Sequence, residues 1–295
     1  MKDKLERSGQ YMKSGLVLEG GAMRGMYTAG IMDVFMDENI EFDGIIGVSA
    51  GAVFGVNYLS KQRGRVIRYS KKFNPDKNYI SIGSLLRTGD IVNTEFAYGK
   101  VPRELDVFDD ETFEKSGVPF YAVVTDMYTG MPKYIKKDRV FEQLNVLRAS
   151  ASMPFMSRPV IIGGIPCLDG GISDSIPFEH FAEMGYKKQV VILTRDINYV
   201  KKPLPPMLAK VYYRKYPVFA ERLKMRYDNY NKKIERLKKK EENGDIFVIR
   251  PTKPIEIKKI ERNPEKLQKV YELGVGDAKA AVSAVKEFLS GERHI

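Results

Sequence analysis

Two short apolar runs, each followed by a glycine-rich turn and a helical pattern, constrain the fold of this chain most strongly. The first run, residues 15–19, leads through a cluster of glycines to apolar residues at helical spacing over residues 26–36. The second run, residues 42–48, leads through a sharp turn to a small-residue helix over residues 50–59. Strands that alternate with helices predict βαβ units, and therefore an α/β fold with a mainly parallel sheet and helices on both faces.

The rest of the chain extends this pattern and predicts one domain over residues 13–290. Strands are expected at 120–126, 132–135, 160–162, 189–193 and 245–251, and helices at 65–73, 139–149 and 176–184. Residues 78–96 are predicted to be rich in loops with short helical turns. We expect a motif-bearing core over residues 13–195, a basic helical insertion over about 201–243 that is broken or re-angled near Pro217, and a last strand with closing helices over 245–290.

Positive charge is concentrated in the predicted insertion. The chain has a net charge of +11, and residues 201–243 carry 14 lysines and arginines against five aspartates and glutamates. Such a segment attracts anionic lipid headgroups or nucleic acid, or it is simply a solvated helix. The single cysteine, Cys167, excludes a disulfide within the chain, and residues 1–10 are polar, so the expected location is the cytoplasm. No apolar stretch approaches the length of a spanning helix, so any membrane contact is expected to be peripheral.

Residues 47–51, Gly-Val-Ser-Ala-Gly, match the G-x-S-x-G pattern of a nucleophile elbow. The apolar run ends at Val48 and the helix begins at Ala50, which is the strand-turn-helix context that such an elbow requires. Gly47 and Gly51 remove side chains that would collide with neighbouring elements, and the helix directs its N-terminal dipole at the turn. Ser49 is therefore the candidate nucleophile, with an incidental serine in a tight turn as the alternative.

The glycine cluster before the first helix is the second candidate element, because its backbone N–H groups can converge on an anion. It consists of Gly20, Gly21, Ala22, Met23, Arg24 and Gly25. A dinucleotide-binding fingerprint needs glycine where this chain has Ala22, and a Walker loop needs Lys and Ser/Thr after the last glycine, where Met26 and Tyr27 stand. An oxyanion-binding loop fits best, with plain packing of the glycines as the alternative.

A base for Ser49 is the third requirement, and the chain has only two histidines, His180 within a predicted helix and His294 next to the last residue. Asp169 is the carboxylate candidate, because Gly170 and Gly171 follow it and predict an exposed, sterically open turn. Aspartate is a weaker base than histidine by ~3.5 kcal/mol, from reference pKa values of about 3.9 and 6.5. Partial burial and a strong oxyanion hole, at about 3 to 4 kcal/mol per donor, would offset that difference. Asp169 could instead stabilise only its own turn.

These elements in this order resemble the patatin-like phospholipase family: the glycine loop with Arg24, then residues 47–51, then Asp169 with Gly170 and Gly171. Residues 149–155 are also similar to the family's Ala-Ser-x-x-x-Pro block, and the resemblance covers residues 13–193. It implies a Ser49/Asp169 dyad without histidine, a three-layer α/β/α sandwich, and hydrolysis of fatty-acyl esters without metal or cofactor. Many members have three consecutive glycines in the loop, so Ala22 is a departure that disfavours a positive φ there.

The resulting hypothesis is a serine-dependent lipid acyl hydrolase that forms an acyl-enzyme while the N–H groups of Gly20, Gly21, Ala22 and Met23 hold the oxyanion. The expected partners are a lipid or acyl-ester substrate and an anionic membrane on its inner face, with no nucleic acid. The acyl pocket is expected to use side chains from residues 78–113. Two alternatives stay open: a non-enzymatic module that binds phosphate or nucleic acid, and an α/β-hydrolase triad of Ser49, Asp169 and His180.

Overall fold

The computed structural model describes residues 12–291, and at its centre lies an eight-stranded mixed sheet. The strands are β1 (Ser14–Leu18), β2 (Gly44–Val48), β3 (Phe120–Asp126), β4 (Pro132–Lys137), β5 (Val160–Ile162), β6 (Ile165–Asp169), β7 (Lys188–Ile192) and β8 (Ile246–Ile249). Their order is β5-β6-β3-β2-β1-β7-β8, with β4 also paired to β3. The five strands from β3 to β8 along this order are parallel, and β4, β5 and β6 add antiparallel pairings.

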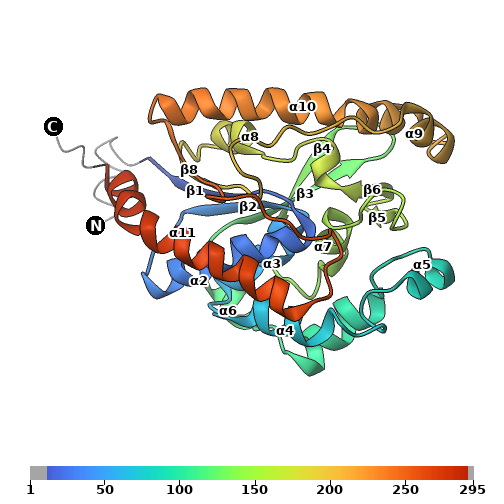
Figure 1. Cartoon of the computed structure of the whole chain (residues 1–295), viewed down its shortest axis with the longest axis horizontal. Coiled ribbons are helices and arrows are strands. Elements are labelled where there is room, and N and C mark those ends of the chain that lie inside the picture. The colour runs from blue at the N-terminus through green and yellow to red at the C-terminus, as the bar shows by residue number, and fades with distance from the viewer. Residues whose placement is uncertain (1–11, 292–295) are drawn as a thin grey trace.

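Helices cover both faces of the sheet, as Figure 1 shows, with α8 and α10 above it and α2, α3, α4 and α11 below. The helical segments are η1 (Ala22–Gly25), α2 (Met26–Asp37), α3 (Ala50–Leu59), α4 (Arg65–Phe73), α5 (Ile82–Thr88), η2 (Glu95–Leu105), α6 (Asp110–Lys115), α7 (Leu144–Ser150), η3 (Gly170–Ile172), α8 (Phe178–Glu183), α9 (Pro206–Tyr212), α10 (Pro217–Glu242) and α11 (Pro264–Ser290). This arrangement confirms the predicted three-layer α/β/α fold with a mainly parallel sheet.

Burial on both faces explains why the central strands read as unbroken apolar runs. In β1, Leu16 and Leu18 pack into the core below the sheet, whereas Val17 packs into the core above it, and all three are fully buried. Successive side chains of a strand point to opposite faces, so a strand covered on both sides has no polar position. The two apolar cores therefore hold the carboxyl ends of β1 and β2 rigidly in place.

Helix α11 packs along α2, and two glycines allow the close approach of these helices. A Cβ at Gly30 would clash with the backbone carbonyl of Tyr271, and one at Gly274 would clash with that of Tyr27. The hydroxyl of Tyr271 also donates to Asp33 at 2.7 Å. Because β8 pairs in parallel with β7, the segment that follows the basic helices completes both the sheet and the layer below it.

Several predicted elements differ from the structure. Residues 78–96 contain α5 and the start of η2, an 11-residue π-helix with Pro102 inside it, which no sequence periodicity indicated. Helix α7 begins only at Leu144, because residues 140–143 form turns. A further strand, β6, was not expected, and the basic segment consists of two helices, α9 and α10, separated before Pro217 as predicted. Residues 1–10 and His294, which the sequence analysis considered, lie outside the described residues.

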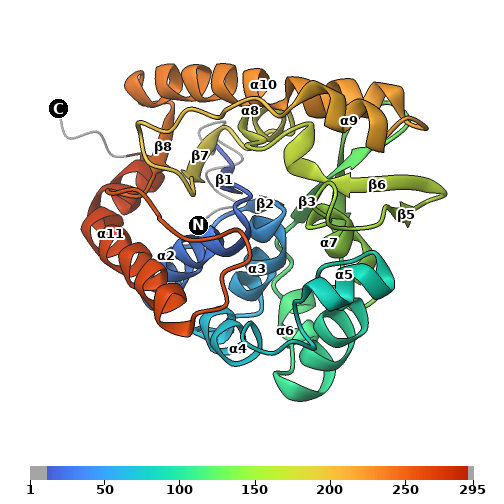
Figure 2. The ribbon, with the colours of Figure 1, turned by 45° about the vertical axis from the view of Figure 1, so that its right-hand side comes forward.

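Figures 1 and 2 show the same arrangement at the end of the molecule that carries the β5–β6 hairpin. In both views α9 lies above the β5–β6 hairpin and α5 lies below it. The carboxyl ends of β2 and β6 meet along β3, and ligands bind at the carboxyl ends of strands in open α/β sheets.

Candidate active site

Ser49 lies between β2 and α3 with φ +54° and ψ −121°, a backbone conformation that residues other than glycine rarely adopt. The two flanking glycines allow this turn. A Cβ at Gly47 would lie 2.5 Å from the carbonyl oxygen of Gly51, and a Cβ at Gly51 would clash with the carbonyl oxygen of Leu18. Ser49 therefore occupies a strained strand-to-helix turn at the N-terminus of α3, as an elbow requires.

The edge of β3 brings Ser49 and Asp169 together. Strand β4 occupies one edge of β3 from Phe120 to Thr125, so β2 and β6 share the other edge. Val48 pairs with Val123 and Asp169 pairs with Val124, so the carboxyl ends of β2 and β6 meet. The Ser49 hydroxyl donates to Oδ2 of Asp169 at 2.8 Å, and the N–H of Gly171 donates to Oδ1 at 2.8 Å.

The expectation that Asp169 lies on an exposed turn is wrong. Asp169 is the last residue of β6 and only 5% exposed, because Gly163 and Gly164 turn the chain back and convert the predicted turn into a second hairpin strand. Burial raises the pKa of the Asp169 carboxyl, against the opposing effects of the Arg226 charge and of the hydrogen bond from Ser49. A raised pKa makes this carboxylate a stronger base than an exposed aspartate.

Ser150 fixes the backbone around the elbow. Its hydroxyl accepts a hydrogen bond from the N–H of Ser49 at 2.9 Å and donates to the carbonyl of Val123 at 2.7 Å. All three residues are buried. Ser150 thus ties the nucleophile turn to the same strand, β3, that aligns Asp169.

The glycine loop lies directly against the elbow. A Cβ at Gly20 would lie 2.9 Å from the Cβ of Ser49, and one at Gly21 would lie 2.5 Å from the hydroxyl oxygen of Thr194. Ala22 takes a φ of +49°, so the methyl group does not prevent the positive φ that we expected it to disfavour. Gly25 lies in the core, where a Cβ would meet the ring of Phe54.

The N–H groups of the loop are not equivalent. The N–H of Met23 donates to the carbonyl of Lys259 at 3.3 Å and that of Arg24 to the carbonyl of Gly21 at 3.2 Å. No such partner within residues 12–291 takes up the N–H groups of Gly20, Gly21 or Ala22. Those three are the donors that the loop offers to an anion beside Ser49.

His180 lies apart from this arrangement. Its ring stacks on Tyr134 with centroids 3.6 Å apart, and Nδ1 lies 3.3 Å from the carboxylate of Glu183. It lines a different pocket, together with Asp174 and Glu179, that Ser49 does not reach. The partner of the Ser49 hydroxyl is Asp169, and the structure gives the triad that includes His180 no support.

Two pockets meet at Ser49. One, of about 230 Å³, is lined by Asp169, the glycine loop and a group of lysines and arginines. The other, of about 140 Å³, is mainly apolar and extends under η2. Its walls include Tyr79, Ile80, Tyr98, Val101, Phe108 and Leu147. Part of the lining comes from residues 78–113, where the acyl pocket was expected, and the rest comes mainly from α3, α4, α7 and the loop after β8. Ser49, Ala22, Met153 and Lys259 line both pockets, so the nucleophile stands at the junction of a cationic and an apolar space.

Comparison with known proteins identifies the family. A model of patatin-like phospholipases matches residues 16–182, which is more than half of the chain. The chain therefore belongs to the patatin-like phospholipase family. This match confirms the resemblance seen in the motifs, and its span includes both Ser49 and Asp169. A second model, of a domain of unknown function (DUF6363), matches residues 216–290, which hold α10, β8 and α11.

Each match to an individual relative covers only part of this patatin-like chain and only part of the relative. The uncharacterized protein YjjU of Escherichia coli is 32% identical over 189 residues, 61% of this chain and 51% of its own length. Lysophospholipase nte1 of Aspergillus fumigatus is 27% identical over 202 residues, 65% of this chain and 12% of its own length. The crystal structure of VipD from Legionella pneumophila has a TM-score of 0.45 at 13% identity, covering 93% of this chain and 67% of that one. The chain spans at most about half the length of these two curated relatives.

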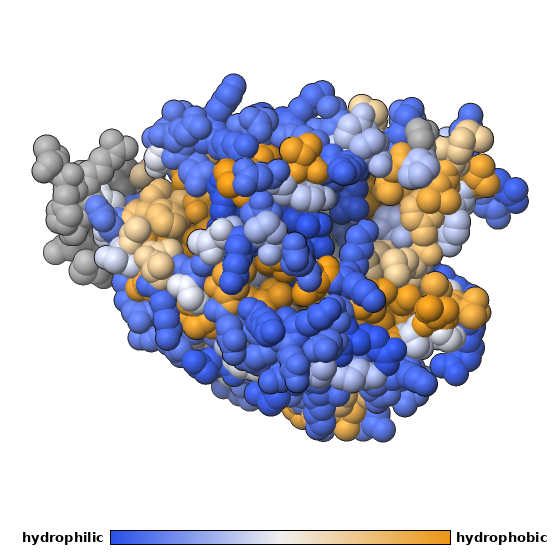
Figure 3. Space-filling view, viewed as in Figure 1, coloured by the Kyte–Doolittle hydropathy of each residue, from blue (hydrophilic) through white to orange (hydrophobic). Residues whose placement is uncertain are grey.

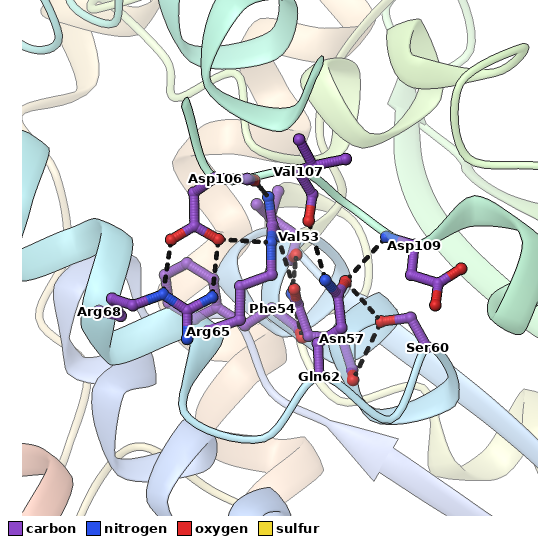
Figure 4. A network of polar contacts seen from close by, with 10 residues as sticks. All are labelled: Val53, Phe54, Asn57, Ser60, Gln62, Arg65, Arg68, Asp106, Val107 and Asp109. Carbon is purple, nitrogen blue, oxygen red and sulfur yellow. Dashed lines mark hydrogen bonds and ion pairs between the residues drawn. The ribbon is translucent and has the colours of Figure 1, made fainter. Parts of the chain in front are cut away.

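Figure 4 shows a polar network around Arg65, a residue that lines the apolar pocket of this patatin-like domain. The buried Arg65 guanidinium donates to Asn57 at 2.7 Å and lies 3.1 Å from Asp106, which Arg68 also contacts at 2.8 Å. Burial lowers the pKa of Arg65. Gln62 adds a hydrogen bond to the carbonyl of Val107 at 2.8 Å. These contacts fix the loop between η2 and α6, which carries Phe108 into the pocket wall.

Several residues of the site were missed in the sequence. Ser150 lies in the Ala-Ser-x-x-x-Pro block, so the motif marked its position but not its contacts. Lys201, Arg226 and Lys259 come from three segments that only the fold brings to Ser49. The charge excess of residues 201–243 was the signal for the first two, although most cations of that segment do not face the pocket.

No helix within residues 12–291 is long and apolar enough to cross a lipid bilayer.

Proposed function

We propose that this chain is a serine-dependent hydrolase of fatty-acyl esters, with Ser49 as nucleophile and Asp169 as its base. The observation that carries the proposal is the 2.8 Å hydrogen bond from the Ser49 hydroxyl to a buried carboxylate, at a serine held in the strained elbow conformation. A serine and its base within hydrogen-bond reach, with the base oriented by a third group, have the geometry of an activated nucleophile. Here the N–H of Gly171 provides the third contact.

In the proposed mechanism, Oγ of Ser49 attacks the ester carbonyl as Asp169 accepts the hydroxyl proton. The carbonyl oxygen becomes an oxyanion, which the free N–H groups of Gly20, Gly21 and Ala22 stabilise. Collapse of this intermediate expels the alcohol, which takes the proton from Asp169, and leaves an acyl-enzyme. Water then attacks the acyl carbonyl with Asp169 again as base, and Ser49 is released with the fatty acid.

The fatty-acyl class of substrate follows from the family and from the shape of the site. The family is named for phospholipases, and one relative is named a lysophospholipase. The apolar pocket beside Ser49 suits an acyl chain, because each buried methylene contributes about 0.8 kcal/mol. The ester carbonyl would then lie at the junction with the cationic pocket, and the alcohol part of the substrate in that second pocket.

Ser49→Ala tests the proposal with two readouts, turnover of p-nitrophenyl butyrate and covalent labelling by a fluorophosphonate probe. We expect wild type to hydrolyse the ester and to be labelled at Ser49, and the variant to do neither while keeping its circular dichroism spectrum. Ser116→Ala is the matched control, because Ser116 hydrogen-bonds only near the end of α6. Ester turnover by Ser49→Ala at the wild-type rate would refute the assignment.

We further propose that the protein binds the surface of an anionic membrane with the end formed by α5 and α9. Ile82 and Leu86 on α5 are 71% and 83% exposed, and Met207 and Val211 on α9 are 68% and 64% exposed. Figure 3 shows apolar side chains above and below the hollow on this side of the molecule. Arg87 on α5, Lys210 on α9, and Arg214 and Lys215 in the turn after α9 are exposed, which suits anionic headgroups.

Flotation with vesicles of phosphatidylcholine, with and without phosphatidylserine, tests the membrane proposal. Leu86→Glu and Val211→Glu should each weaken binding about tenfold, because burying a leucine or valine contributes about 1.5 to 3 kcal/mol. Val107→Glu is the control, since Val107 is 56% exposed but lies on the loop before α6. Binding that ignores both salt and phosphatidylserine, or equal losses in all three variants, would refute this surface.

We also propose that residues 13–290 act as one catalytic unit. Strand β8 pairs with β7, and the loop after β8 supplies Lys259 to the pocket of Ser49. Helix α10 supplies Arg226 to the same pocket. The segment matched by the second family model thus contributes side chains to the site of the first.

A further inference from the structure

Cations from four separate segments converge on the larger pocket beside Ser49. They are Arg24 of η1, Arg195 and Lys201 of the segment after β7, Arg226 of α10, and Lys259 of the loop after β8. With Lys202, six lysines and arginines line this pocket against two carboxylates, Glu19 and Asp169. Of the six, only Arg24 lies within residues 16–182, so the match to the phospholipase model does not account for the others.

None of these pocket cations forms an ion pair with a carboxylate in the part of the chain that the structure describes. Arg226 donates from Nε to the carbonyl of Gly171 at 2.6 Å, and Nε of Arg24 is buried without a hydrogen-bond partner. Other cations of α10 differ: Lys232 pairs with Asp228 at 2.7 Å and Arg236 with Glu179 at 2.6 Å. Most cations of α10 outside the pocket are therefore paired, although Arg222 and Lys239 also have no ion pair among the described residues.

Aromatic rings hold two of the cations in place. The guanidinium of Arg195 lies 4.0 Å from the ring centroid of Tyr199, and Nζ of Lys201 lies 4.1 Å from that of Tyr230. The backbone of Lys201 is fixed by two hydrogen bonds with Asn231, at 2.9 and 3.0 Å. A cation held over an aromatic face keeps its hydrogen-bond donors available, so these side chains are preorganised for an anion.

The two carboxylates of the pocket already have other partners. Glu19 accepts hydrogen bonds from the N–H of Thr194 at 2.6 Å and from the hydroxyl of Tyr230 at 2.8 Å, and Asp169 accepts from Ser49 and Gly171. The cations meanwhile repel one another: burial and the charge of Arg226 lower the pKa of Lys201 to about 7. A cluster of partly buried like charges is costly unless an anion joins it.

We propose that this pocket is a phosphate subsite, which binds a headgroup phosphate on the alcohol side of the ester that Ser49 attacks. Phosphate offers several oxygens to donors that come from four directions, and guanidinium groups bind it through paired hydrogen bonds. A trimethylammonium group would meet the positive charge of these cations, and the rings of Tyr199 and Tyr230 already hold two of them. The preferred substrates are therefore acyl esters with an exposed, anionic phosphate, and this inference rests on the proposed function.

The kinetic test compares octanoyl lysophosphatidic acid, octanoyl lysophosphatidylcholine and monooctanoylglycerol, below their micelle concentrations. We expect wild-type kcat/KM to be at least about tenfold higher for the phosphate monoester than for the neutral glycerol ester, since a charge-assisted hydrogen bond contributes about 1.5 to 3 kcal/mol. Lys201→Gln and Arg226→Gln should each lower that ratio about tenfold. Lys232→Gln, whose cation pairs on α10 itself, should leave the ratio unchanged. The ratio cancels any effect of these variants that is the same for both esters.

A binding test distinguishes a lipid headgroup from free phosphate and needs no turnover. Titration of the Ser49→Ala protein with inorganic phosphate should show binding that Lys201→Gln weakens. Equal kcat/KM values for the phosphate and glycerol esters overturn the proposal, even if inorganic phosphate binds, and so does a ratio that neither variant changes. If no ester is hydrolysed by any form, the proposed function fails, while phosphate binding that depends on Lys201 still supports an anion site.

Discussion

Replacing Asp169 by asparagine removes the proposed base without changing its shape. The N–H of Gly171 donates to Oδ1 of Asp169, so the amide oxygen of an asparagine would take that position and its NH2 group would face Ser49. The Ser49 hydroxyl would then accept a hydrogen bond where it now donates one. Its proton would have no acceptor in the site, so attack on the ester would begin from an un-ionised serine.

The expected loss is large and can be measured with p-nitrophenyl butyrate. General-base catalysis contributes about 10² to 10⁴-fold, so kcat/KM of Asp169→Asn should fall by about three orders of magnitude, or ~4 kcal/mol. Asp174→Asn is the matched control, because Asp174 is equally buried and close in sequence but bonds to Tyr134 and Lys233. A variant Asp169→Asn that keeps more than a tenth of wild-type kcat/KM, or a control that loses as much, would refute the reasoning.

The same variant should not lose stability at neutral or alkaline pH. The folded state raises the pKa of Asp169 above its unfolded value of about 3.9, so the stability present below that pH is lost as pH rises through the folded pKa. Each unit of that rise costs about 1.4 kcal/mol. Asparagine carries no charge, so the melting temperature of Asp169→Asn should equal or exceed that of wild type at pH 8, with the difference shrinking toward pH 4.

Three further predictions concern the walls and charges of the site. Val101→Trp should fill the apolar pocket of about 140 Å³ and lower kcat/KM for a hexadecanoyl ester about 100-fold more than for a butanoyl ester, since each buried methylene contributes about 0.8 kcal/mol. Val107→Trp, at an exposed position, is the control, and equal losses for the two esters would contradict the pocket assignment. Ser150→Ala leaves two buried backbone groups without partners, so denaturant titration should show unfolding free energy lower by about 2 to 4 kcal/mol, and kcat should fall more than KM rises. The acid limb of the pH profile of kcat should lie at higher pH for octanoyl lysophosphatidic acid than for monooctanoylglycerol, because a bound phosphate would raise the pKa of Asp169. Coincident acid limbs for the two esters would contradict this effect.

The sequence was sufficient for the parts of the fold that local chemistry determines. An apolar run, two glycines and a series of small residues predict the strand-turn-helix around Ser49, and helix α3 begins and ends where that pattern predicts. Asp169 was a candidate base because of the glycines that follow it and the lack of a suitable histidine, and the family resemblance paired it with Ser49. The 119 residues between them carry no local signal of contact. Their proximity depends on the shared edge of β3, which is a property of strand order.

The rest required the tertiary structure. Asp169 was expected to be exposed because two glycines follow it, yet those glycines serve a close approach: a Cβ at Gly170 would clash with the carbonyl of Val123. The π-helix η2 has no periodicity that distinguishes it from a loop. In the basic segment, residue type alone could not separate Arg226, which faces the pocket, from Arg236, which pairs with Glu179 at the surface.

Charge links the proposed base to the proposed phosphate subsite. Burial raises the pKa of Asp169, whereas the charges of Arg226 and Lys201 act to lower it, so these cations favour the ionised carboxylate but also weaken it as a base. A phosphate bound among those cations would neutralise part of their field, and the pKa of Asp169 would rise when an anionic substrate is in place. A stronger base would then be present only in the complex, where it accelerates proton transfer from Ser49. An ester without phosphate would leave Asp169 in its weaker state, so the cations select for the headgroup through basicity as well as through binding.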